Sequence, residues 1–260
     1  MSSTQTTAEL SKILNDYYNS MGHIYPDIER LKNLLSEVSD ARRCELLSSI
    51  RGDIALIEAA EQGKTELCVT LLSSLPQADR LKLIPVDELR AAFHFAALWR
   101  YTETILGILN CLTAEQQLQL LCAQDSDGNT ALHHAAAWWG RTETVKSVLD
   151  NLTPEQLLKF ILVRDNGGNT ALHKATQQGH TETMKTLLDN LTHEKQLNLL
   201  YTRNHYGNTA LHDAARKGHT ETLRTLLDNL TPEQQLKLLF IPDIGGNTTL
   251  HYAAQQGHTG

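Results

Sequence analysis

The sequence predicts an all-α solenoid in which about six repeats stack in one direction, each with two helices and an additional short third helix. An octet of the form Gly-Asn-Thr-Ala-Leu-His-x-Ala returns four times, with Thr in place of the first Ala in the last copy. Its histidines lie 40, 39 and 39 residues apart, at His133, His173, His212 and His251. After each octet, apolar residues recur at helical spacing. A period of 20–50 residues is typical of stacked supersecondary units rather than of one globular core.

The first fifty residues are expected to form a helical N-terminal cap or degenerate repeat (residues 1–50). Two amphipathic helices are indicated by apolar residues at helical spacing, at Leu10, Ile13, Leu14 and Tyr17 and then at Ile28, Leu31, Leu34 and Leu35. A third helix is predicted from Asp40 to Leu47. Because a terminal repeat presents one face to water, an atypical sequence is expected there.

Residues 51–260 are expected to hold about six repeats, the last one truncated. The first two copies carry Ile57 and His94 at the motif histidine position. In each repeat the first helix follows the octet turn and ends near a glycine such as Gly179, because glycine readily closes a helix. The second helix carries an apolar stripe at i, i+3, i+4 and i+7, for example Met184, Leu187, Leu188 and Leu191.

The third helix of a repeat is predicted from a capping box. Thr153-Pro154-Glu155-Gln156 places a capping Thr first, then Pro at the first helical position, with Gln completing the box. The same signature stands at Thr231 to Gln234. Its buried side is expected to come from Leu236, Leu238 and Leu239.

The octet and the Gly-His-Thr-Glu-Thr-Leu segment that follows it, as at Gly218–Leu223, resemble the ankyrin repeat. The hallmark of that repeat is Thr-Pro-Leu-His-x-Ala in a unit of about 33 residues. Here Ala or Thr replaces the motif proline, and each unit is about six residues longer, with the excess in the third helix. Long units of this kind resemble those of effector proteins from intracellular bacterial pathogens.

The recurring polar residues are expected to be structural. The resemblance implies that each motif histidine bonds its Thr and the neighbouring backbone and so ties the repeats together. Residues three positions before the turn glycine suit Asx turns, namely Asp125, Asp165, Asn204 and Asp243. The histidines after the helix-closing glycines are expected to bond backbone groups, namely His23, His180, His219 and His258. We therefore expect no metal site, no cofactor and no catalytic residue.

Composition narrows the class of partner and the location. A net charge of −7 argues against nucleic acid, since phosphate binding needs a basic field. The N-terminus carries no secretory signal pattern, and no apolar run approaches the ~18 residues that span a bilayer. The four cysteines form no CxxC pair and suggest a reducing compartment. We expect a monomeric cytoplasmic protein, or one in the host cytosol if it is a secreted effector, with a protein as its partner.

Tryptophans indicate the predicted binding face. Trp99 and Trp139 both precede the position that closes the first helix, where later repeats carry Gln or Lys. A position that accepts such polar residues faces solvent, and exposed Trp is enriched in binding hot spots. In ankyrin-like arrays this helix end lies on the concave, partner-binding side, as the resemblance implies. The predicted partner-binding residues are Phe95, Trp99, His134, Trp138 and Trp139, with a basic extension of Lys174, Arg203, Arg216 and Lys217.

One irregularity falls inside this predicted face. From His133 to Thr142 the chain has one residue more than the corresponding stretch of the other repeats, such as His173 to Thr181. A bulge or extra turn residue would redirect a side chain and often marks a functional site. Alternatively, one tryptophan, Trp138 for example, fills a gap between repeats.

The function expected from these residues is a non-enzymatic protein-binding scaffold. A rigid array loses little conformational entropy when it binds. The alternative is a substrate-recognition region of a larger enzyme whose catalytic domain lies beyond residue 260, since the chain stops within a repeat. A spacer or oligomerising role is a third reading.

Overall fold

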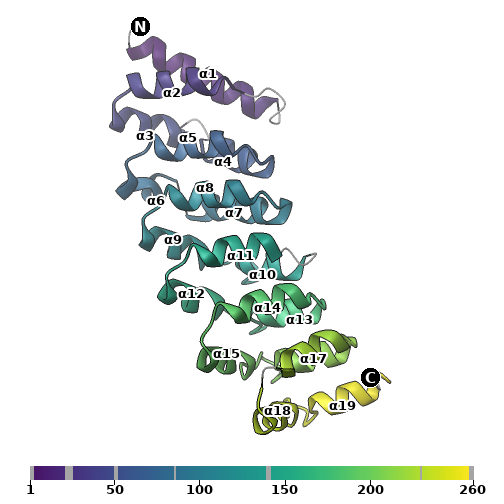
Figure 1. The fold of residues 1–260 in the computed structure, drawn as a ribbon. Helices are drawn as coiled ribbons and strands as arrows, with labels where there is room; N and C mark the ends of the chain where they lie inside the picture. Colours follow the sequence, from purple (N-terminus) through teal and green to yellow (C-terminus); the bar gives the residue numbers. More distant parts are fainter. Residues whose placement is uncertain are drawn as a thin grey trace. The chain divides into compact units, whose positions relative to one another are not determined.

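The computed structural model describes residues 3–20, 26–49, 52–84, 86–138, 142–228 and 230–257, and within these ranges every regular element is a helix (Figure 1). The helices form two compact units, residues 1–123 and 124–260, hereafter unit 1 and unit 2. The all-α repeat fold expected from the sequence is confirmed.

Unit 1 contains the predicted N-terminal helices and the first repeats. Its elements are α1 (Ser3–Asn19), α2 (Ile28–Glu37), α3 (Asp40–Ser49), α4 (Gly52–Glu61), α5 (Thr65–Ser73), the 3₁₀ helix η1 (Gln77–Asp79), α6 (Arg80–Leu83), α7 (Val86–Trp99), α8 (Thr102–Asn110) and α9 (Ala114–Leu121). The stripe of α2 is buried as predicted, and so are Leu10, Leu14 and Tyr17 of α1.

Unit 2 repeats a three-helix pattern with little variation. Its elements are α10 (Ala131–Ala137), α11 (Thr142–Asp150), α12 (Pro154–Ile161), α13 (Ala171–Gln177), α14 (Thr181–Asp189), α15 (His193–Leu200), α16 (Ala210–Lys217), α17 (Thr220–Asp228), α18 (Pro232–Leu239) and α19 (Thr249–Gln255). Counting the equivalent helices of unit 1 as well, we call α4, α7, α10, α13, α16 and α19 the inner helices, α5, α8, α11, α14 and α17 the outer helices, and α9, α12, α15 and α18 the added helices.

Within each unit, helices that occupy the same place in successive repeats pack on one another. In unit 2 each inner helix contacts the next inner helix, and each outer helix contacts the next outer helix. In unit 1 α4 packs on α7 in the same way, and α5 packs on α8. Alanines such as Ala175 and Ala214, both fully buried, let the inner helices approach closely. Hydroxyl pairs also join neighbouring outer helices, as between Thr181 and Thr222 at 2.8 Å.

The added helices α12 and α18 begin with the predicted capping boxes. Thr153 and Gln156 satisfy each other's backbone N–H, and Thr231 pairs with Gln234 in the same way. The fourth residue of α18, Gln235, donates to the carbonyls of Leu227 and Leu230 and so caps the end of the outer helix before it.

The prediction that Leu236 is buried is wrong. Leu238 is buried, but Leu236 is 57% exposed. Residues two apart on a helix are about 200° apart around its axis, so they cannot both face the core.

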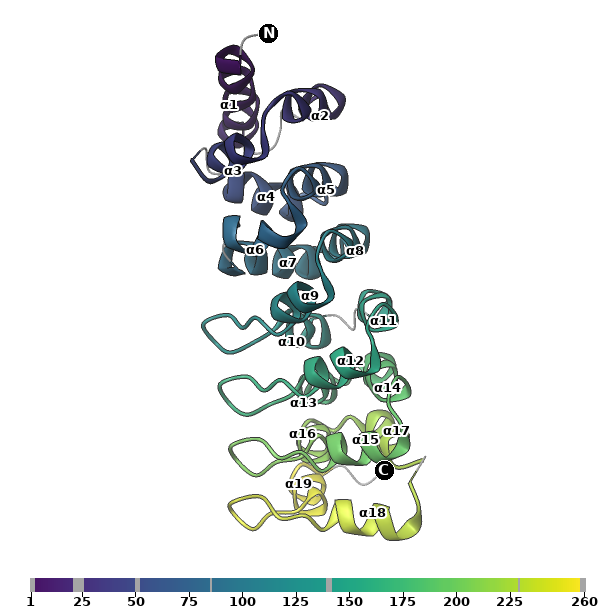
Figure 2. The same cartoon turned by 90° about the vertical axis from the view of Figure 1, so that its left-hand side faces the viewer.

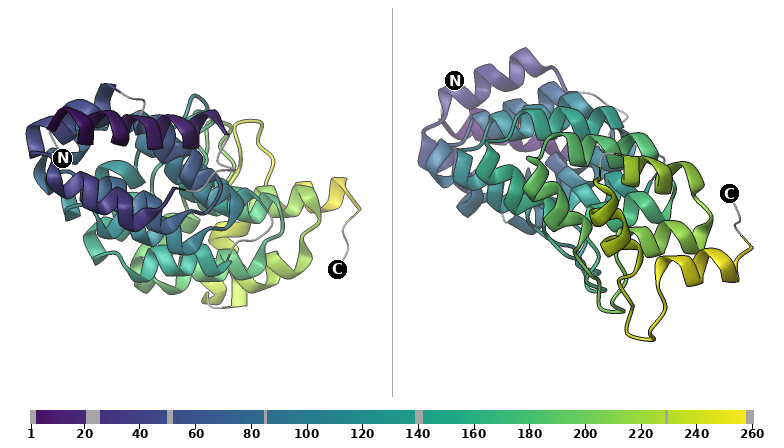
Figure 3. Two further views of the ribbon diagram at one scale, coloured as in Figure 1. Left: turned by 90° about the horizontal axis from the view of Figure 1, so that it is seen from above. Right: turned by 60° about the horizontal axis from the view of Figure 1, so that its bottom comes forward.

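Loops that we call fingers join each added helix to the next inner helix, and they project together along one edge of unit 2 (Figures 2 and 3). The predicted Asx turns are present. The Asp165 Oδ1 accepts N–H bonds from Gly167 at 2.9 Å and from Asn169 at 2.8 Å. Gly168 adopts φ +79°, and an added Cβ there would lie 2.8 Å from the backbone nitrogen of His205, so the close approach of the next finger requires glycine.

Candidate functional site

The motif threonine and histidine form a pair that we call the Thr–His latch, and it fixes the start of α10, α13 and α16 to the next repeat. The His173 Nδ1 accepts the backbone N–H of Thr170 at 3.3 Å and the Thr170 hydroxyl at 2.9 Å. With Nδ1 accepting, the proton lies on Nε2, which donates to the carbonyl oxygen of Asn208 at 3.1 Å. The same bonds fix His133 to Asn169 and His212 to Ile241. The role implied for these histidines by the resemblance is confirmed.

The electrostatics of the latch agree with a structural role. Burial lowers the pKa of His173 to about 4, and burial also lowers the pKa values of His133 and His212. These rings are therefore neutral at pH 7. Both nitrogens of each ring are already bonded, which leaves no lone pair for a metal ion and no proton to transfer.

The histidines after the helix-closing glycines also bond to the backbone, as predicted. The His180 Nε2 lies 3.3 Å from the carbonyl oxygen of Ala137, and the His219 Nε2 lies 3.1 Å from that of Gln177. Each ring thus links its repeat to the preceding one. The other two predicted members, His23 and His258, fall outside the described residues.

The exposed side of the inner helices carries the predicted binding residues. We define the inner-helix face by two positions, the residue directly after the motif histidine and the residue four further on. The later position is exposed from α7 onwards, with Trp99 at 53% in unit 1 and Trp138 at 51% in unit 2, whereas Gln62 of the first repeat is half-buried. Gln178 and Lys217 are exposed at the same position, so the expectation of a solvent-facing position is confirmed. Phe95 of α7 is half-buried.

The register of the two adjacent tryptophans differs from the prediction. The Trp138 backbone N–H donates to the His134 carbonyl at 3.0 Å, as that of Gln178 donates to Lys174 at 3.2 Å. Trp138, not Trp139, therefore occupies the position of Gln178. Helices α10 and α13 have equal length, so the extra residue does not bulge the helix but lies after Trp138. Trp139 itself is outside the described residues.

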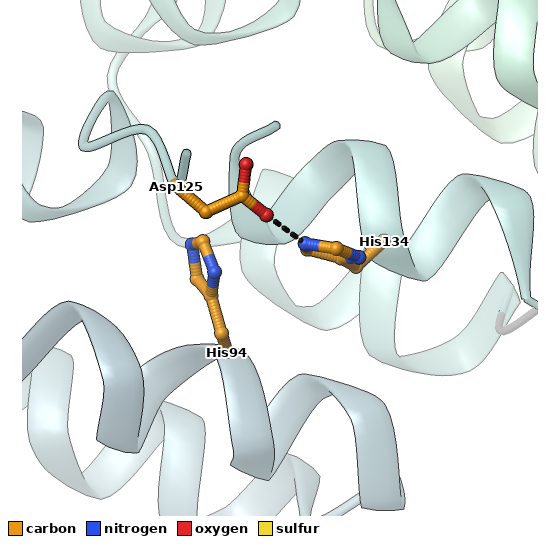
Figure 4. Close-up of side chains that lie close together, drawn as sticks. All are labelled: His94, Asp125 and His134. Carbon is orange, nitrogen blue, oxygen red and sulfur yellow. Dashed lines mark hydrogen bonds and ion pairs between the residues drawn. The ribbon is translucent and has the colours of Figure 1, made fainter. Parts of the chain in front are cut away.

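A second set of contacts links three of the fingers to their inner helices. The free oxygen of the turn carboxylate accepts a bond from the residue directly after the motif histidine. Asp125 pairs with His134 at 2.7 Å (Figure 4), Asp165 with Lys174 at 2.7 Å, and Asp243 with the Tyr252 hydroxyl at 2.6 Å. In the remaining repeat the turn residue is Asn204, whose amide donates to the Asn169 side chain at 2.8 Å, and the helix position carries Asp213, which pairs with Arg216 at 2.9 Å.

These pairs were missed at the sequence level, although their signal is simple. In three repeats the partner stands nine positions after the turn residue, and an acid in the turn is matched by a donor on the helix. The partners also set the pKa values of the acids. Although burial opposes it, the bonds from Lys174 and Asn169 lower the pKa of Asp165 to about 2.

The predicted basic extension is therefore already engaged within the protein. Lys174 pairs with Asp165, and the Arg216 guanidinium lies 2.9 Å from Asp213. Arg203 lies on a finger, where it donates to the carbonyls of Gly207 at 2.9 Å and Pro242 at 2.5 Å. Three residues of the basic extension lie on inner helices. Of these, Lys217 is exposed, whereas Lys174 and Arg216 are half-buried.

Comparison with known proteins identifies the repeats. The family model "Ankyrin repeats (3 copies)" matches residues 153–237 and 195–260, and "Ankyrin repeat" matches residues 127–152. The chain belongs to the ankyrin repeat family. Ankyrin repeats are in general protein–protein interaction modules, and the proteins that contain them are typically non-catalytic.

Structural comparison supports the same fold. Among 371 matching chains of solved structures is EF0377, an ankyrin repeat protein, with a TM-score of 0.59 and 24% sequence identity over 78% of this chain and 92% of that one. A search of curated proteins found no match. None of the described helices is both long and apolar enough to cross a membrane.

Proposed function

We propose that the chain is a non-enzymatic scaffold that binds another protein through its inner-helix face. The observation that carries the proposal is the exposure of Trp99 and Trp138, each by more than half, at the same position of an inner helix in unit 1 and in unit 2. Exposed tryptophan is uncommon and is enriched among residues that dominate binding energy.

The surroundings of each tryptophan support a preformed site. In unit 2 the neighbouring His134 is held by Asp125, and the helix start is fixed by the Thr–His latch of His133. In unit 1 Trp99 ends α7, whose Phe93 and Ala96 are buried. A surface held in this way loses little conformational entropy on binding, which favours affinity.

The partner is expected to be a protein of a eukaryotic host. This part of the proposal rests on the length of the repeats, which resembles that of effectors from intracellular bacterial pathogens. A cytosolic location would follow from it, and the chain would act there as a monomer.

The test is affinity capture from eukaryotic lysate, followed by titration of the purified partner. We expect Trp99→Ala and Trp138→Ala to weaken binding at least tenfold each, as hot-spot truncations do. Tyr206→Ala is the matched control, because Tyr206 is an exposed aromatic residue on a finger and lies outside the inner-helix face. Unchanged affinity in both tryptophan variants would place the binding site elsewhere, and a partner lost only with Tyr206 would place it on the fingers.

A further inference from the structure

The three added helices of unit 2 turn the same face outward. At 100° per residue, the second, fifth, sixth and ninth positions counted from the helix start fall within about 100° of arc. We call the residues at these positions the added-helix face: Glu155, Leu158, Lys159 and Leu162; Glu194, Leu197, Asn198 and Tyr201; Glu233, Leu236, Lys237 and Phe240. The added helices are the part of the repeat that the usual ankyrin unit lacks, and the inner-helix face does not include them.

Apolar side chains on this face are open to solvent. Leu162 is 37% exposed, Leu236 57% and Phe240 60%, whereas Leu158 and Leu197 are half-buried. The opposite sides of the same helices are fully packed, for example by Phe160 and Leu199. Helix α18 is the most exposed because no described helix stacks beyond it. Each added helix thus contributes an apolar pair one turn apart to a stripe that runs along the stack.

The added helices of unit 2 form a column between the fingers and the outer helices (Figure 2), and long side chains join α15 and α18. The Lys237 ammonium lies 5.3 Å from the centre of the Tyr201 ring, and the Gln234 amide lies 3.3 Å from the His193 ring. By contrast, the inner helices meet through buried alanines. The apolar stripe therefore lies on helices that side chains bridge, and not on helices packed closely against one another as the inner helices are.

A row of acids borders the stripe on one side. Glu155, Glu194 and Glu233 occupy the second position of their helices and are exposed, and in the described part of the chain none of them forms an ion pair. A glutamate in a first turn complements the helix dipole. That role explains one glutamate in each helix, but it does not require apolar residues one turn away on the same exposed face.

We propose that the added-helix face binds an amphipathic α-helix of a partner protein, which lies along the stack with a Lys- and Arg-rich flank over the row of glutamates. The spacing favours this geometry. The inner helices of successive repeats in unit 2 pack on one another with their axes about 8–10 Å apart, so the added helices, one in each repeat, recur at a similar step. Residues seven apart on a helix are separated by about 10.5 Å. One apolar residue in each heptad of the partner can therefore meet each added helix in turn.

The probes are two synthetic peptides of about three heptads that share a leucine face and carry either Lys or Glu along the flank. Anisotropy titrations with the full chain are expected to give at least tenfold tighter binding of the Lys-flanked peptide. The double variant Leu236→Gln, Phe240→Gln should weaken that binding about tenfold. The triple variant Glu155→Lys, Glu194→Lys, Glu233→Lys should reverse the order of the two peptides. All five substituted side chains are exposed, so circular dichroism should remain unchanged.

Trp138→Ala is the matched control and should leave peptide binding unchanged, which separates this proposal from the function proposed for the inner-helix face. Hydrogen exchange should show peptide-dependent protection in residues 154–162, 193–201 and 232–240. Equal binding of both peptides to the parent chain would overturn the proposal, as would unchanged binding in the double and triple variants. Concentration-dependent dimers that the triple variant abolishes would also overturn it, because the occupant would then be a second copy of the chain.

Discussion

Units 1 and 2 follow the same period but connect their helices differently. In unit 1 only residues 84–85 separate α6 from α7, whereas in unit 2 residues 162–170 form a finger between α12 and α13. The inner helix of unit 1 is correspondingly longer, because α7 starts eight residues before His94 while α13 starts two residues before His173. The length of the repeat is nearly the same in the two units. Residues that form the finger in unit 2 correspond to residues that form the first turns of α7 in unit 1.

The residue three positions before the motif histidine accounts for part of the difference. In unit 2 it is a threonine, such as Thr170, whose side chain and backbone bond to the histidine. These bonds set the residue at which the helix begins. In unit 1 the equivalent of Thr170 is Ala91, which lies within α7. Alanine favours the helix interior and cannot cap. The repeat of α7 thus lacks the capping threonine, and it also lacks the turn glycine that each finger of unit 2 carries, such as Gly168.

Removing a latch from unit 2 should have the largest effect. His173→Ala leaves the Thr170 N–H and the Asn208 carbonyl unpaired in the core and opens a cavity, so we expect a loss of about 3–4 kcal/mol in the free energy of unfolding. Denaturant unfolding measures this loss. At the same position in unit 1, Ile57→Val should cost less than about 1.5 kcal/mol. His251→Ala, where the ring is exposed, is a second control, and equal losses at His173 and His251 would contradict the role of the latch.

Acid should destabilise unit 2 through the same histidines. Because the pKa of His173 is about 4 when folded and 6.5 for an ordinary histidine side chain, the unfolded chain binds more protons between these values. Stability is therefore retained above pH 6.5 and falls as the pH drops towards 4, by about 3 kcal/mol for His173 alone. Unfolding at pH 7 and 4.5 measures the loss. In His173→Gln the slope should be shallower, and hydrogen exchange should rise more in unit 2 than in unit 1.

Changing Asn204 and Asp213 into an acid and a donor, as in the other repeats, should have an intermediate effect on the free energy of unfolding. Asn204→Asp removes the amide that donates to the Asn169 side chain at 2.8 Å and adds a second acid to the repeat that carries Asp213, so we expect a loss of about 2 kcal/mol. Adding Asp213→Lys recreates the Asp165–Lys174 arrangement and should recover at least about 1 kcal/mol. Additive losses in a double-mutant cycle would show that the two positions are independent.

The smallest effect should be the same in both units. Thr113 of unit 1 and Thr153 of unit 2 form identical capping boxes with Gln116 and Gln156. Replacing either threonine by alanine should cost about 1 kcal/mol, as for other N-caps. Thermal unfolding of the two variants measures the losses, and a much larger loss at one of them would show that the added helix has different roles in the two units.

Much of the architecture could be predicted because it repeats locally. The turn, the capping boxes and the apolar stripes each use residues within a few positions of one another, and the sequence displays several copies of each. The added helix of each repeat was predicted for this reason from Thr153 and Thr231.

The remaining features depend on spatial relations that local patterns do not contain. Leu236 belongs to the same leucine-rich helix as Leu238, and only the direction of the helix in the fold decides which one is exposed. The extra residue near Trp138 could be placed in the helix or after it, and counting back from Thr142 favoured the wrong choice. The finger–helix pairs join residues nine apart across a turn, as do Asp165 and Lys174, so a search at helical spacing passes over them.

Each finger is joined to the preceding one by a backbone hydrogen bond, beside side-chain bonds such as that from Arg203 to the Pro242 carbonyl. The N–H groups of Asn166, His205 and Ile244 donate to the carbonyls of Asp127, Gly167 and Tyr206 in the preceding fingers, at 2.9–3.0 Å. No side chain takes part in these bonds, and the donor positions carry an amide, an imidazole and an aliphatic group. A substitution at His205 or Ile244 can change what a finger presents while this backbone bond is kept, whereas at Asn166 it would also remove the bond from the side-chain amide to the Ser126 carbonyl at 2.9 Å. Selection for a new partner can therefore act on His205 and Ile244 while the scaffold keeps its stability.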